Sequence, residues 1–161
     1  MTISHVFFAS REHAEGLAGN ACTAVISITD PGAPAAKLCP QFKDVLRLSF
    51  YDAVPAEEYL PAPMPGMFDH FMARSIGDFV HKMHAHPTNR SVMVHCEYGV
   101  SRSAAVALFV EAYAGAPLAA REFAHDANQW VVDRLLGQHP DLHIEIPANT
   151  AHENRAQPRA D

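Results

Sequence analysis

The sequence predicts an α/β fold: a single domain with a central, mostly parallel sheet of about four to five strands flanked by helices. Two observations support this. Short apolar segments typical of strands alternate with segments of helical spacing, and 48% of the 161 residues are hydrophobic. Such a chain can bury one core without metals or disulfides, and this alternation is typical of a sheet covered on both faces. We expect the domain to span residues 1–146 and residues 147–161 to be a flexible tail with little to bury.

Three strands are predicted in the first third of the chain. Residues 3–9 (ISHVFFA) and 22–28 (CTAVISI) are rich in apolar and β-branched side chains, and residues 44–50 (DVLRLSF) alternate between apolar and polar. Between the first two, SREHAEGLAG predicts a helix that is capped by Ser10 and ends near Gly19. A turn-rich segment, TDPGAPAAKLCPQ, precedes the third strand.

The longest helix is predicted between Pro65 and His86. Its apolar residues recur at helical spacing: Met67, Phe68, Phe71, Met72, Ile76, Phe79, Val80 and Met83. SVMVH (residues 91–95) then has the nearly continuous apolar character of a buried strand in a parallel sheet. The helices that follow are interrupted at Gly115-Ala116-Pro117 and at Gly137.

Charge and composition exclude several classes of protein. A formal net charge of -6 argues against a nucleic-acid binder, which needs a basic surface to neutralise phosphates. The N-terminal stretch MTISHVFFASREHAEGL has no cationic leader, and we find no apolar run long enough to cross a bilayer. We therefore expect a cytoplasmic protein that binds neither nucleic acid nor membranes.

Neither a disulfide framework nor a metal site is predicted. The three cysteines, Cys22, Cys39 and Cys96, form no CxxC pair. The histidines of HKMHAH (residues 81–86) have no acidic or thiolate partner motif, so a solvated helix end is expected there. We expect no metal and no cofactor.

The segment HCEYGVSRS (residues 95–103) connects the buried strand to the next helix. In a parallel sheet, ligands bind at the carboxyl ends of the strands, where loops enter helix N-termini. The backbone N–H groups of such a loop, with the first turn of the helix, form a binding site for a tetrahedral oxyanion. Gly99 permits the close backbone approach, and the planar guanidinium of Arg102 can bind two oxygens of one anion.

Cys96 is placed to act as a nucleophile under this anion. A helix N-terminus and nearby cations stabilise the thiolate form of a cysteine. Attack on a phosphate ester would give a cysteinyl-phosphate and expel an alcohol or phenol, and water would then release phosphate. Ser103 can donate a hydrogen bond to the departing sulfur, and His95 is expected to orient the loop rather than to act as a base.

HCEYGVSRS resembles the HCxxGxxR[ST] phosphate-binding loop (HCx5R) of cysteine-dependent protein tyrosine phosphatases, and GVSRS is similar to the dual-specificity branch. AVISITDPGAP and VLRLSFYD also look like segments of compact bacterial phosphatases, so the resemblance covers roughly residues 20–137. It implies a phosphatase-type loop between a central strand and a helix, and a catalytic domain over residues 1–146. The phosphate-binding residues it implies are Glu97, Tyr98, Gly99, Val100, Ser101 and Arg102. The substrate would be a phosphorylated protein or a small phosphomonoester, and the loop would also bind phosphate and other oxyanions.

The leaving group needs a proton, which a positioned carboxylic acid can supply for a rate gain of roughly 10² to 10⁴. Asp52 follows a strand at the position where dual-specificity phosphatases carry their general acid, and we favour it. Asp69 is the alternative, because its sequence distance from Cys96 is closer to that in many relatives. Helical periodicity, however, places Asp69 near the start of the long helix. The proline-rich insertion at residues 53–66 departs from the family pattern and suggests a lid or a substrate rim.

Two other classes of function stay open. A phosphate-binding module with little turnover would keep the loop but lack a well-placed acid. Arsenate reduction or sulfur transfer normally needs resolving cysteines or another loop length, and neither is evident. The sequence does not decide between phosphotyrosine, phosphoserine or phosphothreonine and small substrates, nor does it give the oligomeric state.

Overall fold

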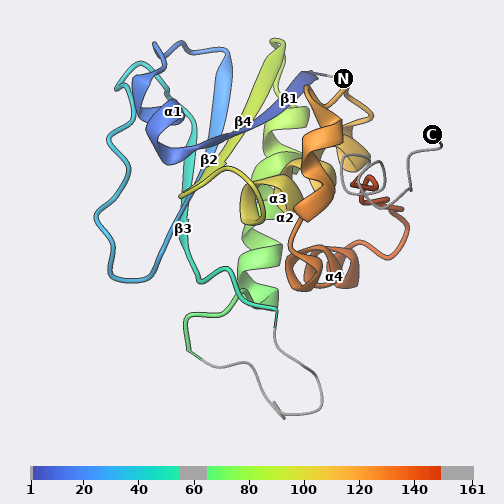
Figure 1. The fold of residues 1–161 in the computed structure, drawn as a ribbon. Coiled ribbons are helices and arrows are strands. Elements are labelled where there is room, and N and C mark those ends of the chain that lie inside the picture. Colours follow the sequence, from blue (N-terminus) through green and yellow to red (C-terminus); the bar gives the residue numbers. More distant parts are fainter. Residues whose placement is uncertain (1, 55–64, 150–161) are drawn as a thin grey trace, which may run out of the picture.

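Four segments of apolar and β-branched residues form one parallel sheet in the computed structural model, which describes residues 2–54 and 65–149 (Figure 1). The strands are β1 (Ile3–Ser10), β2 (Thr23–Thr29), β3 (Val45–Ser49) and β4 (Arg90–Cys96), in the order β1-β4-β2-β3. The predicted α/β class and parallel sheet are therefore confirmed, with four strands in the described ranges. Because all four are parallel, their carboxyl ends lie at one edge of the sheet.

β4 is a central strand, and the register shows what lies beside its end. Cys96 pairs with Ser10 of β1, and His95 pairs with Ser27 of β2. All residues of β2 are buried, and in β4 all but Ser91 are buried, as expected for strands covered on both faces. The segment HCEYGVSRS therefore starts in the middle of the sheet.

The helices are α1 (Arg11–Gly16), α2 (His70–His84), α3 (Arg102–Ala114) and α4 (Gln129–Gln138), with a 3₁₀ helix, η1 (Arg121–Asp126). The predicted Ser10 cap is present, since its side chain accepts a hydrogen bond from His13 N. α1 is shorter than expected: Leu17 is extended, so the helix stops at Gly16 and not near Gly19.

α2 also starts later than predicted, at His70 instead of Pro65. Asp69 caps the helix by accepting a hydrogen bond from Met72 N at 2.9 Å. Phe68 precedes the helix but is buried, and its ring packs on Phe50 with the centroids 4.8 Å apart. The apolar residues at helical spacing therefore begin before the helix does, because Phe68 is a core residue in the preceding loop.

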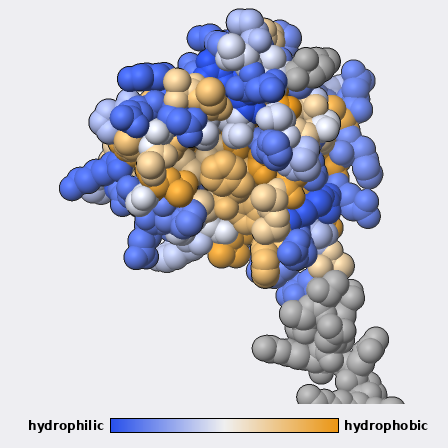
Figure 2. Space-filling model, turned by 90° about the horizontal axis from the view of Figure 1, so that it is seen from above, coloured by the Kyte–Doolittle hydropathy of each residue, from blue (hydrophilic) through white to orange (hydrophobic). Residues whose placement is uncertain are grey.

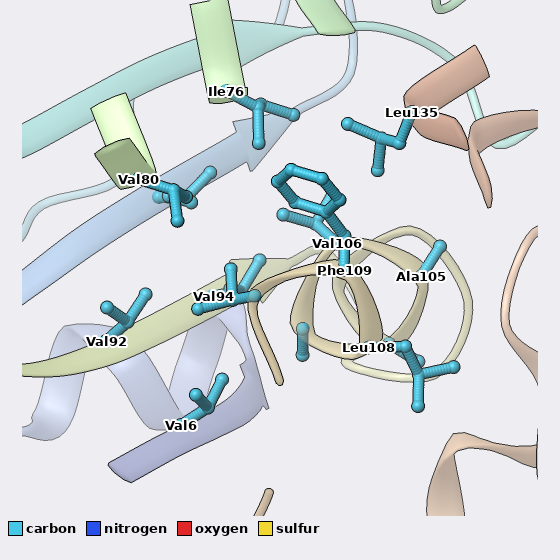
Figure 3. Packing of buried hydrophobic residues seen from close by; sticks show 14 of the residues in the cluster. Val6, Ile76, Val80, Val92, Val94, Ala105, Val106, Leu108, Phe109 and Leu135 are labelled. Atoms are coloured by element: carbon cyan, nitrogen blue, oxygen red, sulfur yellow. The ribbon is translucent and has the colours of Figure 1, made fainter. Parts of the chain in front are cut away.

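The main core lies between one face of the sheet and α2, α3 and α4. Figure 3 shows Phe109 of α3 between Ile76 of α2 and Leu135 of α4, above Val94 of β4. A smaller cluster on the other face joins α1 to Val25, Phe42 and Met93. The sheet is thus covered on both faces, but one side is covered mainly by the short α1 and an irregular segment.

Some apolar side chains stay on the surface, and Figure 2 shows a group of them in the middle of one face with hydrophilic ones around it. The large exposed hydrophobic residues are Tyr51, Val54, Phe71, Tyr98, Val100 and Phe123. In the described ranges, no helix is long and apolar enough to cross a membrane.

Two expected segments fall largely or partly outside the described residues. Of the proline-rich insertion at residues 53–66, residues 55–64 are not described. Of the expected tail, only residues 147–149 are described. Just before it, Leu142, Ile144 and Ile146 pack partly on the main core.

Candidate functional site

The loop of residues 97–101 leaves the end of β4 and enters α3 at Arg102. The segments that follow β2 and β3 end at the same edge of the sheet, since the strands are parallel. Asp30 directly follows β2, and Asp52 lies three residues after β3. Ligand-binding residues of open α/β sheets collect at such an edge.

Cys96 is buried, and its sulfur has two polar neighbours from its own loop and helix. Gly99 N donates a hydrogen bond to Cys96 Sγ at 3.3 Å. Ser103 Oγ lies 3.1 Å from the same sulfur. At that distance a thiol donates to the hydroxyl oxygen, and a thiolate would accept from the hydroxyl. The loop therefore folds back over Cys96.

The loop takes its shape from Gly99, whose φ of +72° is in the left-handed region. A Cβ atom there would lie 2.4 Å from Ser10 N, so the loop also packs directly on the end of β1. At the end of the loop, Ser101 O accepts a hydrogen bond from Asn128 N at 3.1 Å. Contacts from outside the loop thus hold it at its middle and at its end.

Arg102 is buried, and its guanidinium has fixed partners. Nη1 donates to Asp30 Oδ1 at 2.7 Å and to Phe50 O at 2.6 Å. The buried Nε has no hydrogen-bond partner within the described ranges. Asp30 was not predicted as a site residue, although an acidic residue two positions after a predicted strand, at the ligand-binding edge, was a usable signal.

Asp52 is brought to the loop. Its Oδ1 accepts hydrogen bonds from Ser101 Oγ at 2.8 Å and from Asn128 Nδ2 at 2.7 Å. Asn128 is buried and also caps α4 by accepting from Val131 N. The sequence could identify Asn128 as a cap, but no local pattern places it beside Asp52.

Asp69 has a different environment from Asp52. Its Oδ1 accepts the capping hydrogen bond from Met72 N, and within the described residues no hydrogen bond or ion pair connects it to the loop. The structure therefore places one of the two candidate aspartates against the loop and the other at a helix start.

His95 lies on the opposite face of the sheet from Cys96, because successive side chains of a strand alternate. Its Nε2 is 2.6 Å from Ser27 Oγ, and its Nδ1 is 3.3 Å from Cys96 O. Burial lowers the pKa of His95, which favours the neutral ring. A neutral ring that donates from Nδ1 to Cys96 O and accepts from Ser27 satisfies both contacts.

The remaining loop residues differ in exposure. The side chain of Glu97 forms an ion pair with Arg11, with Nη1 and Oε1 3.2 Å apart. Tyr98 is 83% exposed and Val100 is 43% exposed, so both side chains face solvent. Their predicted contribution to anion binding is through backbone N–H groups.

Away from the loop, Cys22 is exposed and Cys39 is partly buried, and both are free thiols like Cys96. His81 Nδ1 lies 2.7 Å from the Tyr113 hydroxyl. In the part of the chain that the structure describes, no group of three or more His, Cys, Asp or Glu side chains could hold a metal ion.

No protein-family model matches the chain, and a search of curated proteins finds no match. The chemistry of the site is therefore inferred from its residues: a cysteine, an arginine and an aspartate around a short loop at the carboxyl edge of a parallel sheet.

Proposed function

We propose that this protein is a phosphomonoester hydrolase of the cysteine-dependent tyrosine or dual-specificity phosphatase type. The observation that carries the proposal is the pair of contacts to Cys96 Sγ, from Gly99 N and from Ser103 Oγ at the start of α3. Together with Arg102, the first residue of that helix, they provide a sulfur nucleophile beneath an oxyanion-binding loop.

In the first step, Cys96 Sγ attacks phosphorus and forms an S–P bond while the bond from phosphorus to the leaving oxygen breaks. The loop N–H groups and Arg102 stabilise the negative charge on the phosphoryl oxygens. Asp52 gives its proton to the leaving oxygen. The hydrogen bonds that Ser101 and Asn128 donate to Oδ1 fix the carboxyl group, and we assign Oδ2 as the atom that carries the proton.

In the second step, water attacks phosphorus and its proton passes to Asp52. The S–P bond breaks, phosphate leaves, and Cys96 recovers its thiolate. The Ser103 hydroxyl, 3.1 Å from the sulfur, donates a hydrogen bond to this departing thiolate. His95 keeps the end of β4 in place through Cys96 O and takes no proton.

A phosphate-binding module with little turnover is the second candidate. Arg102 Nη1 is already paired with Asp30 and with Phe50 O, so part of its charge is neutralised before any anion arrives. Such a site can bind an anion through the loop N–H groups and still stabilise a transition state poorly.

The substrate that we propose is a phosphorylated protein or a small phosphomonoester in the cytoplasm. The loop contains no lysine, and Tyr98 and Val100 expose a tyrosine and an aliphatic side chain beside it. These features give no support for a highly charged polyphosphate, which would favour a more basic surface.

The test is hydrolysis of two aryl phosphates, one with a good and one with a poor leaving group. Cys96→Ser should abolish turnover, and Cys22→Ser, which changes an exposed cysteine, should not. Asp52→Asn should lower the rate roughly 10²- to 10⁴-fold with the poor leaving group and less with the good one. Asp69→Asn should match wild type, because Asn caps a helix about as well as Asp.

Each departure from this pattern has a distinct meaning. If Asp69→Asn alone shows the dependence on leaving group, the acid is Asp69 and our assignment is wrong. If the wild-type protein binds vanadate but does not turn over, the binding module is correct. If Cys96→Ser retains full activity, both readings fail.

A further inference from the structure

Arg11, the first residue of α1, contacts the loop with both its backbone and its side chain. Its backbone N donates to Glu97 O at 3.2 Å, and its Nη1 donates to Glu97 Oε1 at 3.2 Å. The same guanidinium has two further partners: its Nε lies 3.4 Å from Glu15 Oε2, and its Nη2 donates to Ala35 O at 3.1 Å. Arg11 therefore connects the residue after Cys96 to its own helix, α1, and to the segment at Ala35.

The backbone contact fixes one peptide plane of the loop. The Glu97–Tyr98 peptide bond is trans, since the described chain has no cis peptide bonds. In a trans peptide the C=O and the following N–H point in opposite directions. Because Glu97 O points to Arg11, the N–H of Tyr98 points away from α1.

The next N–H group of the loop faces the nucleophile, since Gly99 N donates to Cys96 Sγ. Gly99 itself leaves no room for movement toward β1, because a Cβ there would lie 2.4 Å from Ser10 N. The peptide before Tyr98 is the one that the backbone N–H of residue 11 holds through Glu97 O.

The side-chain contact has an electrostatic role. Glu97 carries a negative charge on the loop that is proposed to bind an oxyanion, and like charges close together repel. The ion pair with Arg11 compensates that charge, and both side chains are mostly buried, which reduces screening by solvent. Loss of Arg11 would leave the Glu97 carboxylate beside the bound anion.

We propose that the Arg11 side chain is a positioning group for oxyanion binding: it holds the Glu97 side chain and neutralises its charge, while the backbone N–H of residue 11 orients the Tyr98 N–H. This inference rests on the proposed function for its catalytic consequence. It goes beyond the loop itself, because Arg11 lies outside HCEYGVSRS and its polar contacts are with Glu97, Glu15 and Ala35.

The test compares wild type, Arg11→Met, Glu97→Gln and the double variant. Inhibition by inorganic vanadate and kcat/KM for an aryl phosphate are measured, with urea unfolding for each protein. Arg11→Met keeps the backbone hydrogen bond to Glu97 O and removes the ion pair, so it should weaken vanadate inhibition and lower kcat/KM by about ten- to a hundredfold, equally for good and poor leaving groups. The double variant should be less impaired than the product of the two single effects, since it no longer carries the uncompensated carboxylate.

Arg121→Met is the matched control, because it breaks another arginine–glutamate pair, with Glu111, that contacts no loop residue. It should leave vanadate inhibition within twofold of wild type. The inference is wrong if Arg11→Met changes only the unfolding transition. It is also wrong if the loss of kcat/KM in the double variant equals the product of the losses in Arg11→Met and Glu97→Gln. If the wild-type protein does not turn over, the proposed function fails, and vanadate binding by the same variants still decides the role of Arg11.

Discussion

Cys96 and His95 are neighbours in the sequence, yet they face opposite sides of the sheet and have different chemistry. Cys96 faces α3, where Gly99 and Ser103 contact its sulfur. His95 is fully buried against Ser27 on the other side. The alternation of a β-strand thus separates the nucleophile from the residue that supports the loop behind it.

The burial of His95 predicts a dependence of stability on pH. Burial lowers its pKa from the ordinary value of 6.5, so below pH 6.5 the unfolded chain binds more protons than the folded one. This contribution to stability is complete above pH 6.5 and is lost as the pH falls below it. His95→Gln should therefore lose less free energy of unfolding between pH 7.5 and 5.5 than wild type, as measured by urea denaturation.

The free energy of unfolding of His95→Gln should still fall somewhat as the pH is lowered, because burial also lowers the pKa of His84. If the free energy of unfolding depends on pH equally in His95→Gln and in wild type, the neutral state that we assign to His95 is contradicted.

The strand–loop–helix element from β4 to α3 depends on backbone conformations that few residues adopt. Gly99 and Gly115 have similar positive φ values, +72° and +66°. Their surroundings differ, because a Cβ at Gly99 would meet Ser10 N, whereas nothing lies within 4 Å of one at Gly115. The two glycines therefore separate the cost of the left-handed conformation from the cost of displacing the loop.

Gly115→Ala should lower the free energy of unfolding by about 1 kcal/mol, the cost of the left-handed conformation, and leave aryl phosphate hydrolysis unchanged. Gly99→Ala should move the loop away from β1 and reduce hydrolysis by about a hundredfold or more. Urea denaturation and steady-state rates measure both. Hydrolysis by Gly99→Ala at the rate of Gly115→Ala would show that the loop geometry is not needed.

Across the whole molecule, the parallel sheet gathers residues that are far apart in the sequence. Asp30, Asp52 and Arg102 meet at one edge because each follows the carboxyl end of a strand or the loop after it. The sequence could predict that edge, since strand character and the strand-to-helix segment at Cys96 are local patterns. The ends of its expected strands differ from the observed ones by at most one residue.

Contacts between distant segments could not be predicted in the same way. Asn128 reaches Asp52, and Arg11 reaches Glu97, only because α4 and α1 pack at the loop. Phe68 misled the helix prediction because a core position in a loop has the same apolar character as a buried helix face. The partners of a site are thus set by tertiary packing, whereas its nucleophile and loop are local.

The most direct test of the account is detection of phosphate on Cys96 during turnover. Wild-type protein mixed with an aryl phosphate is quenched in acid within the first turnovers, and its peptides are analysed by mass spectrometry. We predict that phosphate is found on the peptide that contains Cys96, and on no peptide of Cys96→Ser. Turnover by wild-type protein with no phosphate on that peptide, under conditions that preserve a cysteinyl-phosphate standard, would contradict it.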